Sequence, residues 1–372
     1  MKSLLKGFYL AIAVLIAQGL NAQKKEIDIA KNYELMGRFS MALQYYKKAE
    51  AREKYLAEEE RVDLYKSLIF CTDKLKDYKN AEKYFEKIEN LQPLSDSLLV
   101  KYSEVLRTLG SHPKAEKVYR SLVEKQTDQV LKSNMLHTLD WFKKNKNLKQ
   151  PYVIGKTNIN VQGLSMGIAE YKEGVIVGVP KVTDGLTFYN LGYCAKKDSV
   201  TFSEATILSK NLTSKFHEGY PVVDEKNNIL YFTSNSLTKV KIKQGGKKDI
   251  SKNGNVNRLK IYQSTLENGE WTEKEELPFN SMNYDCLHPS VSKDGKTLYF
   301  ASNMTGGAGG YDIYKVEKTS SGWSEPKNLG SRVNTMGDEM NPFVKGDELF
   351  FASRGYYGFG GIDIFKVMLS EE

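Results

Sequence analysis

Apolar residues recur at helical spacing between about residues 26 and 149, and no proline occurs between residues 24 and 92. Apolar positions three and four residues apart share one helix face, so this region predicts amphipathic helices. One pattern occurs three times: an alanine, an aromatic residue four positions later, and an apolar residue three positions after that. The copies are Ala42, Tyr46 and Ala49; Ala81, Phe85 and Ile88; and Ala115, Tyr119 and Leu122.

The anchor alanines are 81 − 42 = 39 and 115 − 81 = 34 residues apart. This pattern resembles the tetratricopeptide repeat, a helix pair of about 34 residues. The small residue lets two helices approach closely, and the aromatic residue fills the space against the next helix. No tryptophan stands early in each unit, so a generic helical bundle stays open as an alternative. Residues 129–146 are expected to form a helix that caps the last repeat.

After Pro151 the pattern changes to short alternating runs separated by Gly, Asn and Asp, which predicts strands joined by tight turns. Each copy has an anchor proline, an apolar and aromatic run, and then a second strand. The prolines are Pro221, Pro289 and Pro342, and the runs are 229–235, 297–303 and 348–354. A degenerate first copy has the run 174–178 in the same place, and in it Ser165 aligns with His288.

Other positions recur with the same period. Asp312 and Asp363 begin the second strand, and Trp271 and Trp323 each follow nine residues after a tyrosine. The copies close with Leu208, Leu277 and Leu329. The prolines are 289 − 221 = 68 and 342 − 289 = 53 residues apart, and the basic insert 239–257 accounts for the longer interval. We expect this insert to be a surface loop.

Four strands per copy and a period near 50 residues predict the blades of a β-propeller. The fold class is therefore multidomain: a tetratricopeptide-like helical solenoid, followed by an all-β propeller of at least four blade-like repeats. The copies resemble WD40-like propeller repeats of the Pro-Asp type, related to the TolB propeller. The resemblance rests on Pro289, 294–296, 298–303, 309–314 and Trp323.

The amino terminus has the pattern of a signal peptide. Lys2 and Lys6 precede the apolar run 8–17, and a cleavage site is expected after Ala22. No later stretch has the roughly 18 apolar residues that a membrane span needs. We therefore predict a signal peptide over 1–22, helical repeats over 23–150 and a propeller, possibly incomplete, over 151–372. The expected location is the periplasm, and an association with the outer membrane is an open alternative.

This order of segments resembles the amino-terminal part of OmpA-family envelope proteins. In that family a peptidoglycan-binding domain follows, and some members belong to type IX secretion and gliding machinery. The sequence stops soon after the strand 364–366, so peptidoglycan binding is not carried over. The last copy is expected to lack its outer strand, and residues 156–161 resemble that strand and are expected to complete it. That the sequence is a truncated form of a longer protein is an open alternative.

The charge pattern limits the kinds of partner that we expect, and the cysteine content argues against disulfides. The chain has a formal net charge of +8, and residues 24–150 carry 26 − 20 = +6 of it in mixed Lys and Glu patterns. Such mixtures are typical of a solvated helix face, so neither nucleic acid nor a membrane span is expected. The three cysteines are far apart and predict free thiols, without a disulfide framework.

Several motifs imitate chemical sites. Residues 163–167 fit the G-x-S-x-G nucleophile elbow, but that elbow needs a following helix, whereas residues 168–171 predict a strand. The glycine clusters 306–310 and 355–361 lack the Lys-Ser/Thr of a phosphate loop and are expected to form turns. The recurrent acids favour turn stabilisation over calcium binding. They are Glu218, Asp285, Asp338, Glu339, Asp312 and Asp363.

Four scattered histidines, at positions 112, 137, 217 and 288, give no zinc pattern. We therefore expect no enzyme activity, no metal and no cofactor. The predicted function is a protein-binding scaffold or adaptor in envelope assembly, whose partners are other envelope proteins. The alternative is a propeller that binds a small ligand, sugar or peptide, with or without weak hydrolase or lyase activity.

Overall fold

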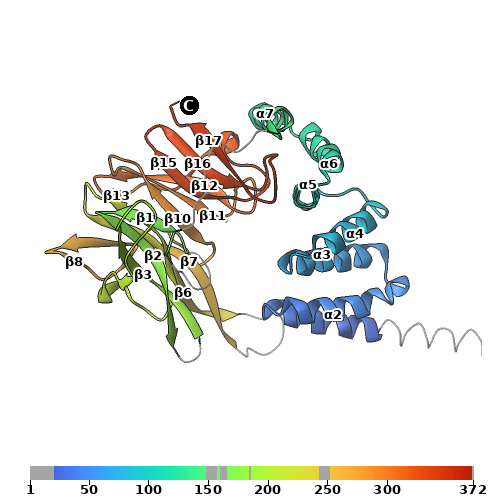
Figure 1. The fold of residues 1–372 in the computed structure, drawn as a ribbon. Coiled ribbons are helices and arrows are strands. Elements are labelled where there is room, and N and C mark those ends of the chain that lie inside the picture. Colours follow the sequence, from blue (N-terminus) through green and yellow to red (C-terminus); the bar gives the residue numbers. More distant parts are fainter. Residues whose placement is uncertain (1–20, 148–156, 160–165, 184–185, 243–251, 371–372) are drawn as a thin grey trace, which may run out of the picture. The chain divides into compact units, whose positions relative to one another are not determined.

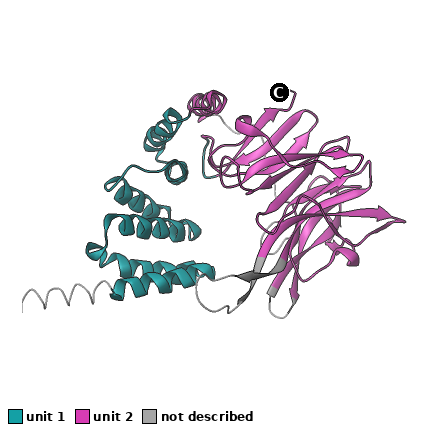
Figure 2. Ribbon diagram, turned by 180° about the vertical axis from the view of Figure 1, so that it is seen from behind, with its two compact units in different colours: residues 1–126, 358–361 teal, residues 127–357, 362–372 magenta. Residues whose placement is uncertain are grey.

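The computed structural model describes residues 21–147, 157–159, 166–183, 186–242 and 252–370. The chain divides into two compact units (Figure 2): residues 1–126 with 358–361, and residues 127–357 with 362–372. The predicted signal sequence, with Lys2, Lys6 and the run 8–17, lies outside the described residues. None of the described helices combines enough length with enough apolar character to span a bilayer.

The first unit is a series of helices in pairs (Figure 1). A helical segment over 21–35 comes first and is followed by the remaining helices. These are α2 (Phe39–Glu50), η1 (Glu53–Tyr55), α3 (Glu58–Lys74), α4 (Tyr78–Glu89), α5 (Asp96–Thr108) and α6 (His112–Glu124). From α2 to α6 each α-helix packs on the next along the chain, as in a repeat array.

The predicted repeat positions form the core of this unit. Ala42, Ala81 and Ala115 are completely buried on α2, α4 and α6. The aromatic residues that follow them are also buried, and the Phe85 ring stacks on Tyr102 with centroids 4.7 Å apart. The tetratricopeptide-like prediction is confirmed.

The second unit contains four antiparallel sheets, which we number in chain order. The first is β1 (Ile168–Tyr171), β2 (Gly174–Thr183), β3 (Leu186–Ala195) and β4 (Thr206–Ile207). The second is β5 (Glu218–Asp224), β6 (Ile229–Ile242), β7 (Lys252–Glu267), β8 (Glu270–Trp271) and β9 (Glu275–Glu276). The third is β10 (Cys286–Val291), β11 (Thr297–Ser302), β12 (Asp312–Thr319), β13 (Gly322–Trp323) and β14 (Lys327–Asn328). The fourth is β15 (Glu339–Lys345), β16 (Glu348–Ser353) and β17 (Asp363–Met368).

These sheets form a β-propeller-like ring, in which the inner strands β1, β5, β10 and β15 pack in succession (Figure 1). Because a sheet between two neighbours is covered on both faces, consecutive residues of its central strand can be apolar and buried, as Leu230, Tyr231 and Phe232 are on β6. On β6, Leu230 and Phe232 pack toward the first sheet, whereas Tyr231 packs toward the third. The prediction of at least four blades is confirmed.

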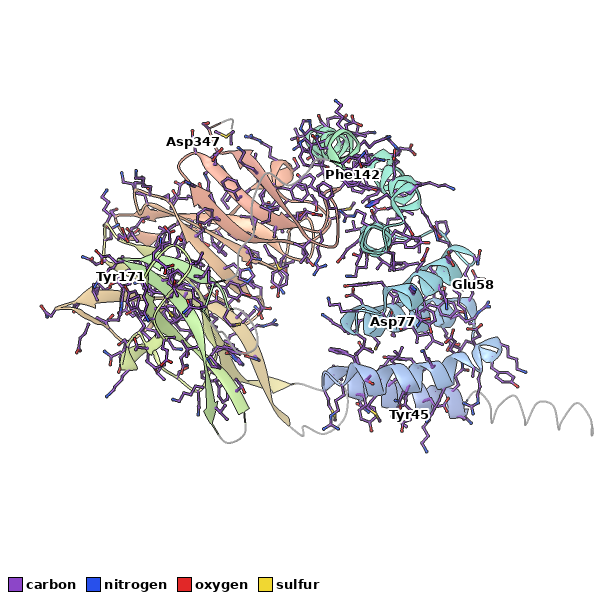
Figure 3. All side chains as sticks on the ribbon, viewed as in Figure 1. Tyr45, Glu58, Asp77, Phe142, Tyr171 and Asp347 are labelled. Carbon is purple, nitrogen blue, oxygen red and sulfur yellow. The ribbon has the colours of Figure 1, made fainter. Side chains whose placement is uncertain are left out.

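The predicted capping helix is α7 (Gln129–Asn145), which groups with the sheets. Its Phe142 (labelled in Figure 3) meets Tyr357 edge-on, with ring centroids 5.1 Å apart. Asp128 caps the helix by accepting hydrogen bonds from the N–H groups of Val130 and Leu131, at 2.9 and 3.0 Å.

The insert 239–257 differs from its prediction as a loop. Strand β6 continues to Ile242 and β7 starts at Lys252, and the two pair through Ile242↔Lys252. A long hairpin satisfies the backbone N–H and C=O groups of both strands, which an irregular loop would leave to water.

Among the described residues the fourth sheet consists of β15, β16 and β17, and residues 156–161 are not shown to complete it. Asn158 instead binds both backbone groups of Phe202, beside the first sheet. Its Nδ2 donates to the carbonyl of Phe202 at 2.8 Å, and its Oδ1 accepts from the N–H at 2.6 Å. Residues 156, 160 and 161 lie outside the described part of the chain.

Candidate functional site

The inner strands carry a row of residues in the left-handed backbone conformation, which we call the axial row. It consists of Gly167, Tyr220, His288 and Asn341, whose φ angles are 80°, 51°, 56° and 51°. The last three directly precede Pro221, Pro289 and Pro342, and at each the pairing of the inner strand shifts by a β-bulge. A bulge redirects a side chain out of the regular pleat. The anchor prolines therefore mark where each inner strand bends.

The first sheet contributes Gly167 to this row, so the alignment of Ser165 with His288 is wrong by two residues. Ala169 pairs with Ile176 as Val222 pairs with Tyr231, which makes Gly167 equivalent to Tyr220. A Cβ at Gly167 would lie 2.7 Å from the Cα of Tyr220, so only glycine fits. Strand β1 follows where a nucleophile elbow needs a helix, and Ser165 itself lies outside the described residues.

His288 links two sheets in the axial row. Its ring lies 4.0 Å from that of Tyr220, and its Nδ1 accepts a hydrogen bond from the N–H of Asn341 at 3.3 Å. Burial lowers the pKa of His288 to about 3, because a charged imidazolium would lose its hydration. The imidazole is therefore neutral at physiological pH and acts as an acceptor between the third and fourth sheets.

A completely buried residue recurs three positions before each anchor proline: Glu218, Cys286 and Glu339. Glu339 accepts hydrogen bonds from the hydroxyls of Thr335 and Ser353, at 2.8 and 2.6 Å. Cys286 contacts Ser302 from the equivalent position, with sulfur and oxygen 3.8 Å apart. Burial raises the pKa of Glu339 to about 7. These contacts tie the start of an inner strand to the end of the next strand in the same sheet.

Glu218 takes this position in the second sheet and lies at the centre of a larger network. It is completely buried, and its Oε1 lies 2.8 Å from the Nζ of Lys274. Its Oε2 accepts from Nδ2 of Asn190 at 2.7 Å, and the Ser214 hydroxyl also donates to it. The carboxylate charge is thus balanced within the protein.

The acids one residue earlier join neighbouring sheets. Asp285 accepts from the N–H of Leu259 at 3.1 Å, and Asp338 accepts from the N–H of Tyr311 at 3.1 Å. The Tyr311 hydroxyl also donates to Asp285 at 3.0 Å. Asp285 therefore holds β7 of the preceding sheet at Leu259, within the strand, and Asp338 holds the backbone directly before β12.

Asp312 explains the first glycine cluster. Its carboxylate accepts from the N–H groups of Ala308 and Gly309, at 2.6 and 3.0 Å. A Cβ at Gly307 would lie 2.6 Å from this carboxylate, and one at Gly309 would collide with the carbonyl of Gly337. The backbone donors that a phosphate would need are bound by a side chain, so the expected turn is confirmed. Asp363 begins β17 opposite Ser353.

The predicted recurrent acids thus stabilise turns and strand ends. No group of three or more His, Cys, Asp or Glu residues that could hold a metal occurs in the described ranges. Of the other histidines, His112 begins α6, His137 lies on α7, and His217 directly precedes β5. All three cysteines are buried free thiols. The recurrent tryptophans belong to the outer strands, and Trp271 is buried between the first two sheets.

Two clefts of the sheet unit could hold a ligand. One of about 610 Å³ lies between the outer strands of the first two sheets and is lined by Tyr171 (Figure 3), Tyr193, Lys210, Glu270 and Trp271. Another of about 450 Å³ lies on the first sheet, beside Val177, Val179 and Phe202.

One face of the fourth sheet carries exposed apolar residues. The equivalent face of the second and third sheets is buried. Ile261, Ile313 and Ile364 are equivalent, since they pair with Thr233, Ala301 and Ala352. The first two isoleucines are fully buried, whereas Ile364 is 78 % exposed.

Phe343 is 58 % exposed on the same face, and its ring lies 6.2 Å from that of Phe350. We call Phe343, Phe350 and Ile364 the open face. Sequence reasoning missed it because the repeat pattern is the same in covered and uncovered sheets. The Lys274 partner of Glu218 was missed because the two residues are 56 positions apart.

Comparisons with known proteins leave the family open. No family model matches the chain, and no curated protein matches it. Among solved structures, it is similar to a puromycin-hydrolysing peptidase of Mycobacterium tuberculosis, at 14% identity and a TM-score of 0.33, over 60% of this chain and 32% of that one. It is also similar to an exo-β-1,3-galactanase of Clostridium thermocellum, at 13% identity and a TM-score of 0.35, over 57% of this chain and 51% of that one.

A third similar structure is an α-L-arabinofuranosidase of Podospora anserina, at 15% identity and a TM-score of 0.33, over 57% of this chain and 66% of that one. The chain spans less than two thirds of the length of each of these proteins. Similarity at this level carries no argument about activity.

Proposed function

We propose that this protein is a protein-binding scaffold of the cell envelope. The single observation that carries the proposal is the open face of the fourth sheet. Soluble proteins rarely expose a contiguous apolar surface unless it binds a partner. Phe343, Phe350 and Ile364 form such a surface. The residues equivalent to Phe350 and Ile364 in the second and third sheets are buried: Tyr231, Tyr299, Ile261 and Ile313.

The helical unit supports the same function. The rings of Phe39 and Phe70 meet edge-on, with centroids 5.7 Å apart, and the Phe70 side chain is exposed. Met36 and Leu75 are exposed large apolar residues at turns that follow equivalent helices. Helical arrays commonly bind other proteins along such surfaces.

The envelope location is part of the proposal and comes from the sequence. A signal peptide over 1–22 and the resemblance to OmpA-family proteins support an exported scaffold whose partners are outer-membrane or secretion components. The recurrent acids support a role without catalysis, because Glu218, Asp312 and Glu339 are engaged in bonds that hold strands together.

In-cell crosslinking followed by mass spectrometry tests the proposal. The tagged protein should give recurrent crosslinks to a small set of envelope proteins, and Phe343→Glu should remove most crosslinks from the fourth sheet. Val182→Glu is a matched control, because Val182 is an equally apolar, exposed residue on β2 of the first sheet. A correctly exported protein that captured no partner, or equal capture by Phe343→Glu and wild type, would refute the proposal.

A second candidate function rests on the cleft of about 610 Å³ between the first two sheets. Tyr193 and Trp271 give it aromatic walls, and Lys210 and Glu270 supply charged groups. Such a mixture suits a sugar or a short peptide. A glycan-array screen of wild type against Lys210→Ala would reveal this function as binding that the variant loses.

A further inference from the structure

The cleft between the first two sheets lies beside a short turn. Strands β1 and β2 are joined by Lys172 and Glu173, whereas the equivalent turn between β5 and β6 consists of residues 225–228. The longer turn packs on the third sheet, because a Cβ at Gly295 would lie 2.2 Å from the Nδ2 of Asn227. Beside the shorter turn, a cleft of about 610 Å³ opens between the first and second sheets.

Aromatic side chains line this cleft at steep angles to one another. The rings of Tyr171 and Tyr193 are 6.2 Å apart with their planes at 84°, and those of Tyr171 and Trp271 are 5.8 Å apart at 51°. Parallel rings would form a slot for a planar group such as a nucleobase, whereas rings at these angles form a curved wall. Such a wall fits a sugar ring, which is not planar and presents C–H groups on its faces.

Tyr193 offers the largest ring surface to a ligand. Tyr171 and Trp271 are buried, whereas Tyr193 is half-buried. A Cβ at Gly174 would lie 2.6 Å from the hydroxyl oxygen of Tyr193, so the absence of a side chain at Gly174 lets this ring lie against the turn. The half-buried side chains of Leu208 and Leu266 extend the apolar lining.

The rim of the cleft carries charged groups. Lys172, Lys210 and Glu270 are all exposed and belong to its lining. Neither lysine has a carboxylate partner among the residues that the structure describes. The Nζ of Lys172 lies 5.0 Å from the centroid of the Tyr171 ring, which places its charge over the aromatic wall. Two ammonium groups without a counter-charge favour a ligand that carries a carboxylate.

The segment that carries Lys210 is fixed in place. It forms the short helix η2 (Lys210–Leu212), and the Ser209 hydroxyl before it accepts from the N–H of Asn211 at 3.2 Å. The Nδ2 of Asn211 donates to the carbonyl of Trp271 at 2.7 Å, which ties this segment to the second sheet. A wall that is already ordered loses little conformational freedom when a ligand binds.

We propose that this cleft binds an acidic oligosaccharide. A sugar ring lies on Tyr193 and the neighbouring leucines, its carboxylate binds Lys172 and Lys210, and Glu270 accepts hydrogen bonds from its hydroxyls. The proposal rests on the second candidate function, ligand binding in this cleft, and names the class of ligand. The tilted rings account for the sugar, and the two lysines without a carboxylate partner account for the acid.

Calorimetric titration of the purified full chain tests the proposal. The probes are trigalacturonate, a hyaluronan tetrasaccharide and sialyllactose, each compared with its own methyl ester. The ester keeps the sugar rings and removes the negative charge, so it is a matched control. We expect saturable binding of at least one acid, and binding of its ester about tenfold more weakly, because the charge-assisted hydrogen bonds are lost.

Substitutions of single lysines provide the second comparison. Lys172→Gln and Lys210→Gln remove one charge each and should weaken binding of the acid about tenfold, with little effect on its ester. Lys318→Gln is the control, because Lys318 is exposed and its Nζ lies 5.7 Å from the Trp323 ring on the third sheet. Its affinity should equal that of wild type. Thermal midpoints show whether each variant folds.

Three results overturn the proposal: binding of none of the acids, equal binding of acid and ester, or equal binding by wild type and both cleft variants. If a triglutamate peptide binds as tightly as the best sugar and with the same dependence on the lysines, the occupant is an acidic peptide and the sugar assignment is wrong. A neutral glycan that binds wild type and not Lys210→Ala would leave the second candidate function standing while this proposal fails. The two failures are therefore distinguishable.

Discussion

The Nζ of Lys274 lies 2.8 Å from the Oε1 of Glu218, and the carboxylate of Glu218 is completely buried. The two residues lie in one sheet, after β8 and at the start of β5. This ion pair therefore fixes the outer rim of the second sheet to its inner strand. The Lys274 Nζ also lies within hydrogen-bonding distance of Ser214 and Ser234, at 3.3 and 3.1 Å.

Removing one charge of the Glu218–Lys274 ion pair should lower the free energy of unfolding more than removing both charges. Lys274→Met leaves the Glu218 carboxylate buried without its counter-charge, and we expect it to lower the free energy of unfolding by about 3–5 kcal/mol. The double variant Glu218→Gln/Lys274→Met should regain part of that loss, because no uncompensated charge remains. Urea unfolding of the three proteins measures both values. A Lys274→Met variant as stable as wild type would contradict the role of this pair.

His288 should make stability depend on pH. Its pKa of about 3 in the folded protein lies below the ordinary value of 6.5, so between these values the unfolded chain binds a proton that the folded chain excludes. The contribution to stability is present above pH 6.5 and is lost as pH falls toward 3, with a slope of up to about 1.4 kcal/mol per pH unit. His288→Gln keeps a hydrogen-bond acceptor without this titration.

Urea midpoints of wild type and His288→Gln, measured from pH 7.5 to 4, check this. As pH falls, the urea midpoint of wild type should decrease more than that of His288→Gln. His137 is exposed on α7, so His137→Gln serves as the control. Parallel curves for wild type and His288→Gln would show that His288 takes up a proton as readily in the folded protein as in the unfolded chain, and would contradict the prediction.

Glu339 should have the opposite effect. Burial raises its pKa to about 7, above the ordinary 4.5, so the folded protein retains a proton that the unfolded chain releases. Its contribution is present below pH 4.5 and is lost as pH rises through 7. Glu339→Gln, which keeps the shape and cannot ionise, should therefore gain stability relative to wild type between pH 5 and 8.

Thermal unfolding midpoints of wild type and Glu339→Gln, measured at several pH values between 5 and 8, test this prediction. The comparison must be made at each pH, because His288 and Glu339 change stability in opposite directions between pH 4.5 and 6.5. A Glu339→Gln variant that becomes relatively less stable as pH rises would mean that the carboxylate is ionised and held by Thr335 and Ser353.

Much of the fold could be predicted from the sequence because the repeats place equivalent residues in equivalent environments. Ala42, Ala81 and Ala115 are buried as expected, and the runs after Pro221, Pro289 and Pro342 form the second strands of their sheets. The site was harder to predict. The axial row depends on backbone angles, and sequence alignment alone placed Ser165 where Gly167 stands.

The open face could not be predicted from the sequence either. Ile313 and Ile364 follow the same motif, so no local pattern distinguishes a buried isoleucine from an exposed one. The difference depends on whether a further sheet lies against the strand, and that is a property of the tertiary structure. The pairing of residues 239–242 with 252–255 was missed because the basic composition suggested a loop, whereas the pairing between β6 and β7 continues into the insert from both sides.

The helical unit gives a last prediction, at the small residue that anchors its second repeat. Ala81 is fully buried on α4, between helices α3 and α5, which both pack on α4. Ala81→Leu adds three carbons to a filled interface and should lower stability by about 1–3 kcal/mol, because neighbouring side chains must leave their preferred rotamers. Lys83→Leu on the same helix is the control, since Lys83 is exposed and leucine has a similar helix propensity. Hydrogen exchange of α3, α4 and α5 should accelerate in Ala81→Leu and stay unchanged in the control. Equal protection in the two variants would show that the alanine is not needed for close packing, and the repeat interpretation of this position would be wrong.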